Sequence, residues 1–361
     1  MTVEPTTLSP TVIIGAGLVG ASVGCALVKA GVAVHLRDSV SSHARVAASR
    51  GAGTTAAADA TDVRLVVVAV PPAALAKVIA DALVKYPQAI VTDVGSVKGT
   101  VLAALRKRDL DLSRYVGSHP MAGSQRVGPL TSRADLFVDR TWVITPHDTS
   151  KAQAVLAVQD LATLCGARRV SMGAAHHDEA VAQVSHLPQL MSTLTAGRLT
   201  QVPDEHLRLA GQGLRDVTRI AESDPRMWTQ IIRANSAAVK DELVAVQAAL
   251  TELLESWDDT EVLTEFLARG RRGTKALPGK HGTGAAEYAH VVVAIPDAPG
   301  ALARLFADIE AAGVNVEDVR IDHDRELEVG YLSVQVAPEK REPLETAMTD
   351  AGWTLRYAED L

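Results

Sequence analysis

The 361-residue chain is poor in aromatic side chains and in cysteine. Phe, Trp and Tyr together make up 3% of the residues, so Ala, Val and Leu must fill the interior. Only Cys25 and Cys165 are present, far apart and in apolar surroundings. This excludes a disulfide framework and a cysteine-rich zinc site. We expect both to be reduced core residues of a cytoplasmic protein.

The chain also lacks an excess of basic charge. Lys and Arg number 36 against 43 Asp and Glu, a net charge of −7, which argues against nucleic acid or an anionic membrane as a partner. Residues 6–28 carry no charge, but Pro10 and several glycines interrupt them and no basic segment precedes them. We therefore expect a strand–turn–helix there, and neither a signal peptide nor a membrane span.

Short apolar runs alternate with helical periodicity through residues 1–173, the first predicted domain. This order predicts βαβ units, a parallel sheet and a doubly wound, Rossmann-like α/β fold. The predicted strands are Thr11–Ile14, Ala33–Arg37, Leu65–Val70, Ala89–Thr92 and Thr141–Thr145. The predicted helices are Val19–Ala30, Ala73–Lys85, Lys98–Arg108 and Lys151–Cys165.

Strand patterns nearly vanish over residues 174–268, which predicts an all-helical second domain with breaks near Pro188, Pro203, Gly211–Gly213 and Pro225. Its apolar faces, such as Val239–Leu254, exceed what one small bundle needs, so we expect a homodimer. Residues 269–286, rich in Gly, Lys and Arg, are interpreted as a linker. Residues 287–361 show the order βαββαβ, the ferredoxin-like arrangement.

The first motif is a glycine-rich turn between the first strand and the first helix. It contains Gly15, Gly17, Leu18, Val19 and Gly20 in the GxGxxG spacing, which lets the backbone approach a pyrophosphate at a helix N-terminus. Asp38 ends the second strand, where a carboxylate can bind ribose hydroxyls and repel a 2′-phosphate. The pattern favours NAD over NADP.

Further polar loops follow other strands, at the sheet edge where such folds bind ligands. Val70 and Pro71 follow the third strand, and the segment Asp93–Lys98, with Asp93 and Ser96, follows the next. Asp93 and Ser96 could also serve only as helix caps. His119, followed by Pro120, is expected in an extended segment on the same rim, where it could act as a base near neutral pH.

Two groups in the helical domain have competing interpretations. His176, His177, Asp178 and Glu179 suggest a metal site, but adjacent histidines do not share a helix face. We interpret them as a helix start and expect no metal. An Arg in the segment Gly211–Trp228 could clamp a substrate carboxylate, although the spacing alone favours a surface ion pair.

Together these motifs resemble the prephenate/arogenate dehydrogenase family of tyrosine biosynthesis. GxGxxGxS (15–22), DxGSxK (93–98), SHPMAGS (118–124), SHLP (185–188) and RDVTRIAxSDPxMW (215–228) occur in the family's order. The resemblance implies that His119 accepts the proton of the substrate's C4 hydroxyl and that Ser96 hydrogen-bonds it. It implies that Arg219 binds a substrate carboxylate.

The same resemblance assigns Ser185, Gln189, Trp228, Gly123 and Ser124 to the substrate site, and Val70, Pro71 and Asp93 to the cofactor site. Prephenate users of the family carry His where this chain has Gln189, so prephenate and arogenate both stay open as substrates. A β-hydroxyacid dehydrogenase would also combine a Rossmann domain with a helical domain, but that class has a catalytic Lys on the long helix that follows. It is disfavoured because Ala174–Arg198 contains no Lys. A non-enzymatic sensor of NAD or amino acids is a further alternative.

The tail is similar to an ACT domain, the amino-acid-sensing module. The residues that carry this resemblance include Asp297, Gly300, Ala301, Leu302, Asn315 and Val316. It implies an aromatic amino-acid effector bound near them, at an interface between two such domains. An ACT fold kept only for oligomerisation is the alternative.

Overall fold

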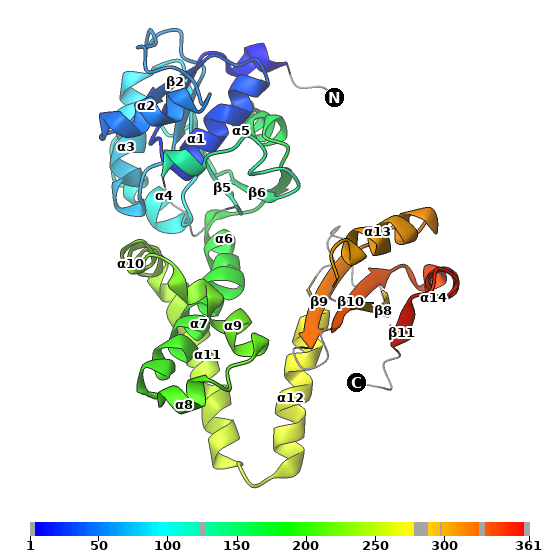
Figure 1. Ribbon diagram of the computed structural model, residues 1–361. Helices are drawn as coiled ribbons and strands as arrows, with labels where there is room; N and C mark the ends of the chain where they lie inside the picture. The colour runs from blue at the N-terminus through cyan, green and yellow to red at the C-terminus, as the bar shows by residue number, and fades with distance from the viewer. Residues whose placement is uncertain (1–3, 123–127, 278–287, 297, 325–328, 357–361) are drawn as a thin grey trace. The chain divides into compact units, whose positions relative to one another are not determined.

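The computed structural model describes residues 4–122, 128–277, 288–296, 298–324 and 329–356 (Figure 1). The chain divides into two compact units, Met1–Ala249 and Leu250–Leu361. Among the residues described, no helix is both long and apolar enough to cross a membrane.

The first unit is built on a seven-stranded sheet in the order β2-β1-β3-β4-β5-β6-β7. Its strands are β1 (Thr11–Ile14), β2 (Val34–Arg37), β3 (Leu65–Val68), β4 (Ile90–Asp93), β5 (Tyr115–Pro120), β6 (Thr141–Thr145) and β7 (Arg168–Ser171). Pairs among β1–β5 are parallel, β6 runs antiparallel to β5, and β7 is parallel to β6. The expectation of a wholly parallel sheet is therefore wrong at β6. The connection from β5 to β6 contains no α-helix among its described residues, and it returns the chain in the opposite direction.

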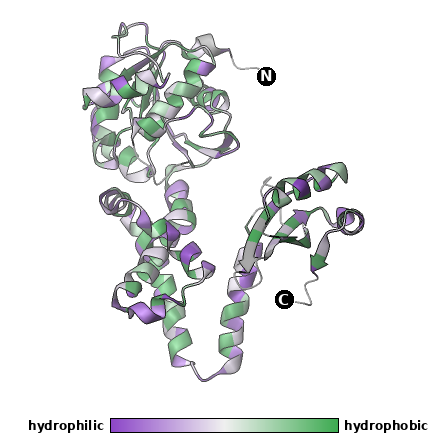
Figure 2. Ribbon diagram, in the orientation of Figure 1, coloured by the Kyte–Doolittle hydropathy of each residue, from purple (hydrophilic) through white to green (hydrophobic). Residues whose placement is uncertain are grey.

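Helices cover both faces of this sheet and bury two separate cores, as a doubly wound fold requires. One core packs α1 (Leu18–Lys29), α2 (Ser41–Ser49) and α5 (Ala152–Leu164). The other packs α3 (Pro72–Lys85) and α4 (Gly99–Arg106). Alternate strand residues serve each face: Ile13 and Leu65 enter the first core, Val12 and Val66 the second. Figure 2 shows hydrophobic and hydrophilic residues side by side on these helices.

The parallel register brings the carboxyl ends of four strands to one edge. Ile14 pairs with Val68, Val68 with Asp93, and Asp93 with Gly117. The segments that follow these strands therefore meet along that edge, which is the ligand-binding edge of such sheets.

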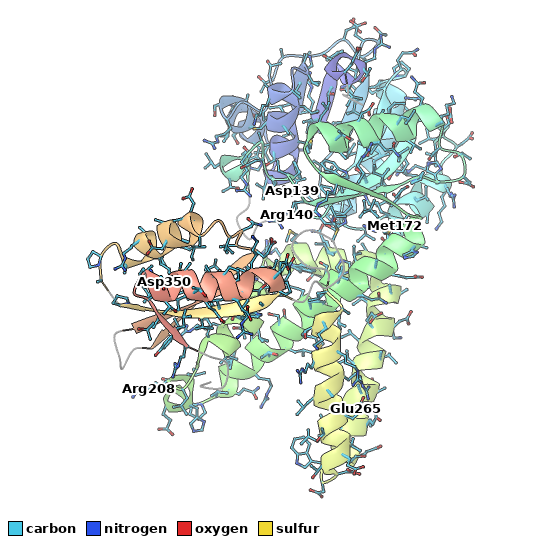
Figure 3. The ribbon with its side chains drawn as sticks, turned by 90° about the vertical axis from the view of Figure 1, so that its right-hand side faces the viewer. Asp139, Arg140, Met172, Arg208, Glu265 and Asp350 are labelled. Atoms are coloured by element: carbon cyan, nitrogen blue, oxygen red, sulfur yellow. The ribbon has the colours of Figure 1, made fainter. Side chains whose placement is uncertain are left out.

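An all-helical segment follows β7, as expected from the sequence; Figure 3 labels Met172 where the two join. Its α-helices are α6 (Ala174–Val181), α7 (Leu187–Arg198), α8 (Asp204–Leu207), α9 (Gln212–Thr218), α10 (Pro225–Ala234) and α11 (Ser236–Glu255). A π-helical turn, Ala182–His186, precedes Pro188, and a 3₁₀ turn spans Arg219–Glu222. Pro188 has no N–H to donate to the preceding turn, which accounts for the irregular helix there.

In the second unit, helix α12 (Thr260–Lys275) extends into residues 269–286, the segment interpreted from the sequence as a linker. Residues 269–275 are helical, because the Asp259 side chain caps the helix at Glu261 and Val262. Gly270 and Gly273 each cost such a helix only about 1 kcal/mol.

The rest of this unit has the predicted order of elements. They are β8 (Ala289–Pro296), α13 (Ala301–Ala311), β9 (Asp318–Asp324), β10 (Val329–Val336), α14 (Arg341–Asp350) and β11 (Thr354–Arg356). The strands form a small antiparallel sheet in the order β11-β8-β10-β9. It packs α13 and α14 through a core that includes Val293, Leu305 and Leu344.

Candidate active site

His119 lies in strand β5, two residues beyond the point where β4 stops pairing. Its backbone is paired with Val143 of β6, so it belongs to a strand and not to the extended segment after a strand that the sequence suggested. The extended conformation itself agrees with the effect of Pro120 on the residue before it. The imidazole is partly exposed at the edge of the sheet.

A chain of hydrogen bonds runs from His119 into helix α6. His119 Nδ1 lies 2.9 Å from Nε2 of His177, and His177 Nδ1 lies 2.8 Å from Oδ1 of Asp178. His177 is fully buried and Asp178 nearly so. The segment interpreted only as a helix start therefore supplies two partners to the histidine at the sheet edge.

Asp178 also joins α6 to the beginning of α4. Its carboxylate accepts the backbone N–H groups of Lys98 at 2.8 Å and Gly99 at 2.7 Å. These amides lie at the N-terminus of α4, where backbone donors lack intrahelical partners. A carboxylate from another helix thus caps α4, and this holds the helical segment against the sheet edge.

Behind His119 lies a buried ion pair between Lys98 and Asp93, 1% and 0% exposed. Lys98 Nζ also donates to the carbonyl of Ser118 at 2.8 Å, next to His119 in sequence. Asp93 further accepts bonds from Tyr115 Oη at 2.8 Å and Gly95 N at 2.9 Å. These internal donors engage the Asp93 carboxylate, which has no exposed surface, and its assignment to the cofactor site stays a prediction.

Electrostatics around His119 favour its neutral form. Burial above all, with the nearby Lys98 ammonium, holds the pKa of His119 well below its usual value. Burial likewise lowers the pKa of His186 to about 4. His119 is thus unprotonated at neutral pH, as a general base must be.

The glycine-rich turn fits a dinucleotide. A Cβ at Gly15 or Gly20 would lie 2.3 Å from Ala69 O or 2.0 Å from Gly15 O, so both glycines allow tight packing of α1 against the sheet. A Cβ at Gly17, by contrast, would meet nothing within 4 Å. Open space at the N-terminus of α1, which begins at Leu18 and Val19, is what a pyrophosphate needs.

Asp38 lies beside this turn at the end of β2. Its Oδ2 accepts the N–H of Ala16 at 2.7 Å and its Oδ1 that of Val40 at 2.8 Å. A carboxylate has about four acceptor positions, so further hydroxyl groups can be bound. Arg37 directs its guanidinium to the carbonyl of Thr55. Val70 and Pro71 follow β3 on the same edge.

The expected substrate residues come from several elements. Ser185 lies partly buried in the π-helical turn, and Trp228 of α10 packs edge-on against His186 with ring centroids 6.0 Å apart. Gln189 is buried and donates from Nε2 to the carbonyl of Ile220 at 3.0 Å, in the 3₁₀ turn that begins with Arg219. Ser96 is partly exposed after β4. Gly123 and Ser124 lie outside the described residues.

Two residues of this site were not singled out as site residues from the sequence, His177 and Lys98. His177 lies 58 residues from His119 and Lys98 lies 20 residues from Ser118, and adjacent histidines gave no spacing signal. Within the part of the chain that the structure describes, no group of three or more His, Cys, Asp or Glu is arranged to hold a metal ion.

A dinucleotide-binding turn and a neutral histidine on one sheet edge define an NAD-dependent dehydrogenase. Two family models match, described as "Prephenate dehydrogenase, nucleotide-binding domain" over residues 23–171 and "Prephenate dehydrogenase, dimerization domain" over residues 173–269. The chain belongs to the prephenate dehydrogenase family.

This chain is also similar to individual proteins whose names are consistent with this family. "Probable prephenate dehydrogenase NovF" of Streptomyces niveus is 35% identical, over 92% of this chain and 95% of the relative. "Cyclohexadienyl dehydrogenase" of Zymomonas mobilis is 33% identical, over 60% of this chain and 76% of the relative. The Aquifex aeolicus prephenate dehydrogenase structure with hydroxyphenyl propionate and NAD+ superimposes with a TM-score of 0.65 at 26% identity, covering 74% of this chain and 97% of that one.

Proposed function

We propose that the protein catalyses the NAD-dependent oxidative decarboxylation of prephenate to 4-hydroxyphenylpyruvate. The observation that carries the proposal is the neutral His119 on the edge that also holds the glycine-rich turn. The similarity of this protein to NovF extends over nearly the whole chain. The Aquifex structure holds hydroxyphenyl propionate, an aromatic acid like the product of this reaction, together with NAD+.

NAD, when bound, accepts a hydride from C4 of the substrate. His119 takes the C4 hydroxyl proton as the hydride departs, and Ser96 orients the hydroxyl. The bond from the ring to its carboxylate then breaks, CO2 leaves and the ring becomes aromatic. His119 returns the proton to the ring oxygen, so the reaction releases no net proton.

Arg219 is proposed to bind a substrate carboxylate. Its guanidinium offers paired donors that match a carboxylate. The Gln189 bond to Ile220 anchors the 3₁₀ turn that carries Arg219. Arg219→Lys should therefore raise KM more than it lowers kcat, because the charge stays and the fork is lost. An unchanged KM would contradict this role.

The experiment that tests the proposal is NADH formation by the full chain with NAD and prephenate, followed by absorbance. Turnover with prephenate supports the proposal. NAD binding without turnover of prephenate or arogenate would overturn it and favour a sensor of NAD or amino acids.

Arogenate is the second candidate substrate, because Gln189 replaces the His of prephenate users and a neutral amide tolerates an amino-acid side chain. Both prephenate and arogenate are cyclohexadienyl compounds, the class in the name of the Zymomonas relative. Gln189→His should shift the ratio of kcat/KM values toward prephenate. Equal efficiencies for both substrates in wild type and variant would sink this role for Gln189.

The C-terminal unit is proposed to be an ACT-like regulatory domain that binds tyrosine or phenylalanine. The βαββαβ order and the positive φ of Gly300 (+87°) at the start of α13 support this. Ala301 and Leu302 open that helix, Val316 packs partly buried, and Asn315 bonds to Glu317. Asp297 lies outside the described residues. Calorimetry on the full chain with each amino acid tests it, and an absence of binding would leave oligomerisation as its role.

A further inference from the structure

The contacts of Asp178 determine where the proton lies on His177. Its carboxylate is nearly buried and accepts two backbone N–H groups besides the bond from His177. An ionised carboxylate only accepts hydrogen bonds. His177 Nδ1 must therefore carry a proton and donate it to Asp178.

The second nitrogen of His177 then determines the tautomer of His119. In neutral His177, Nε2 holds a lone pair and accepts. The only donor it faces in this contact is His119 Nδ1, at 2.9 Å. His119 thus carries its proton on Nδ1, and its Nε2 keeps the lone pair that can take a proton from a substrate.

Resting on the proposed function, we propose that His177, oriented by Asp178, is a positioning residue that keeps His119 in the Nδ1–H tautomer. A cationic His177 would donate from both nitrogens and reverse this tautomer, which would remove the base. The charged groups around the pair are Asp178, bonded to His177 Nδ1, and Lys98, whose ammonium donates to the carbonyl of Ser118. His186 is neutral and receives the Asn235 amide at Nδ1.

Replacement of His177 by Phe and by Gln tests this role. His177→Phe keeps a ring of similar volume and removes the acceptor, so kcat for the preferred substrate should fall roughly 10–100-fold, as when other partners that orient a histidine are lost. KM should change little. His177→Gln places an acceptor oxygen near the former Nε2 and should recover much of kcat. His176→Phe, an exposed neighbour on α6, is the matched control and should keep wild-type kcat.

A kcat within twofold of wild type in His177→Phe would overturn the proposal, as would equal losses in His177→Phe and His177→Gln. A second measurement needs no turnover: nitrogen-15 NMR of histidine-labelled wild-type protein, with His119→Asn for assignment. His119 should be protonated at Nδ1, and a proton on Nε2 would also overturn the proposal. Because the NMR measurement needs no substrate, it tests the tautomer of His119 separately from the proposed reaction.

Discussion

At the scale of single residues, the sheet edge combines a neutral base with a buried ion pair beneath it. His119 is surrounded by groups that oppose a second positive charge, whereas at Lys98 burial lowers the pKa and the Asp93 carboxylate opposes that effect. Two cationic groups would otherwise compete in one desolvated region. In this arrangement His119 stays neutral, while the Lys98 ammonium donates to the β5 backbone at the carbonyl of Ser118.

The first prediction concerns pH. Because the neutral form of His119 is active and its pKa is depressed, kcat/KM should stay level from pH 8 down to the ordinary histidine value of about 6.5. It should fall only at lower pH, as His119 gains a proton. The measurement is a kcat/KM profile in overlapping buffers. An acid limb centred above pH 7 would contradict the predicted direction.

Removal of the base is the companion prediction. His119→Asn should lower kcat about 10²–10⁴-fold, the usual contribution of a general base. NAD affinity and thermal stability should be near wild type, because the side chain is partly exposed. Fluorescence titration with NAD and a melting curve supply the controls. A variant with more than a tenth of the wild-type kcat would exclude His119 as the base.

The ion pair gives a prediction about stability. Lys98→Met leaves the Asp93 charge buried without its main partner, so the free energy of unfolding should drop by about 3–5 kcal/mol. Lys98→Met combined with Asp93→Asn should recover part of that loss, since no charge then stays buried. Urea unfolding of both variants measures this. The prediction fails if the double variant is no more stable than Lys98→Met.

Single residues were predictable where local pattern decides their place, and unpredictable where contacts from distant segments decide. His119 precedes a proline and lies near the carboxyl end of strand β5, so its position on the rim could be predicted although its place within the strand was not. His177 lies on another element, 58 residues away, and only the packing of α6 against the sheet edge brings the two together. Asp93 also follows a strand, but its bonds with the Tyr115 hydroxyl and the Lys98 ammonium form only in the folded chain, so the sequence did not predict them.

At the scale of elements, Gly17 and Gly20, two of the three glycines of the dinucleotide turn, have different roles. Gly20→Ala would drive a Cβ to 2.0 Å from Gly15 O and 2.9 Å from Ala69 Cβ. Backbone must move, so we expect a loss of about 1–3 kcal/mol in unfolding free energy. Gly17→Ala meets no protein atom within 4 Å, so stability should hold while NAD binds roughly tenfold or more weakly, about 1.4 kcal/mol.

Melting curves and NAD titrations of the two variants separate these effects. Each variant is the control for the other, since both add one methyl group to the same turn. If Gly17→Ala bound NAD as tightly as wild type, the pyrophosphate would not lie over Gly17. If Gly20→Ala were as stable as wild type, α1 would not need its close approach to the sheet.

Elements with strong periodicity were predicted closely, and those without it were not. Thr11–Ile14 and Thr141–Thr145 are strands with the expected bounds. β7 carries two arginines and is exposed throughout, so it lacked the apolar run on which strand prediction rests. The direction of β6 depends on the path of the preceding connection, which residue pattern does not encode. Helix α12 continues through residues 269–275 because its cap and charged residues outweigh two glycines.

At the scale of the whole molecule, we propose a homodimer formed through the helical domain. The matching family model is described as a dimerization domain. Helix α11 exposes Val244, Leu250 and Leu254, the last with 68% of its surface accessible. Apolar residues repeated along one exposed helix favour a partner surface. The proposed cytoplasmic location rests on Cys25 and Cys165, both buried and unpaired, and stays a prediction.

The last prediction tests this interface. Leu254→Glu places a charge in the proposed contact, where it would be desolvated, so the protein should sediment as a monomer at concentrations where wild type is a dimer. Val84→Glu changes a residue of similar exposure, 69%, on helix α3 of the nucleotide-binding domain and should leave the dimer intact. Sedimentation velocity at several concentrations measures both. A dimer that withstands Leu254→Glu would remove this end of α11 from the interface, whereas dissociation by both variants would indicate that added negative charge alone drives the chains apart.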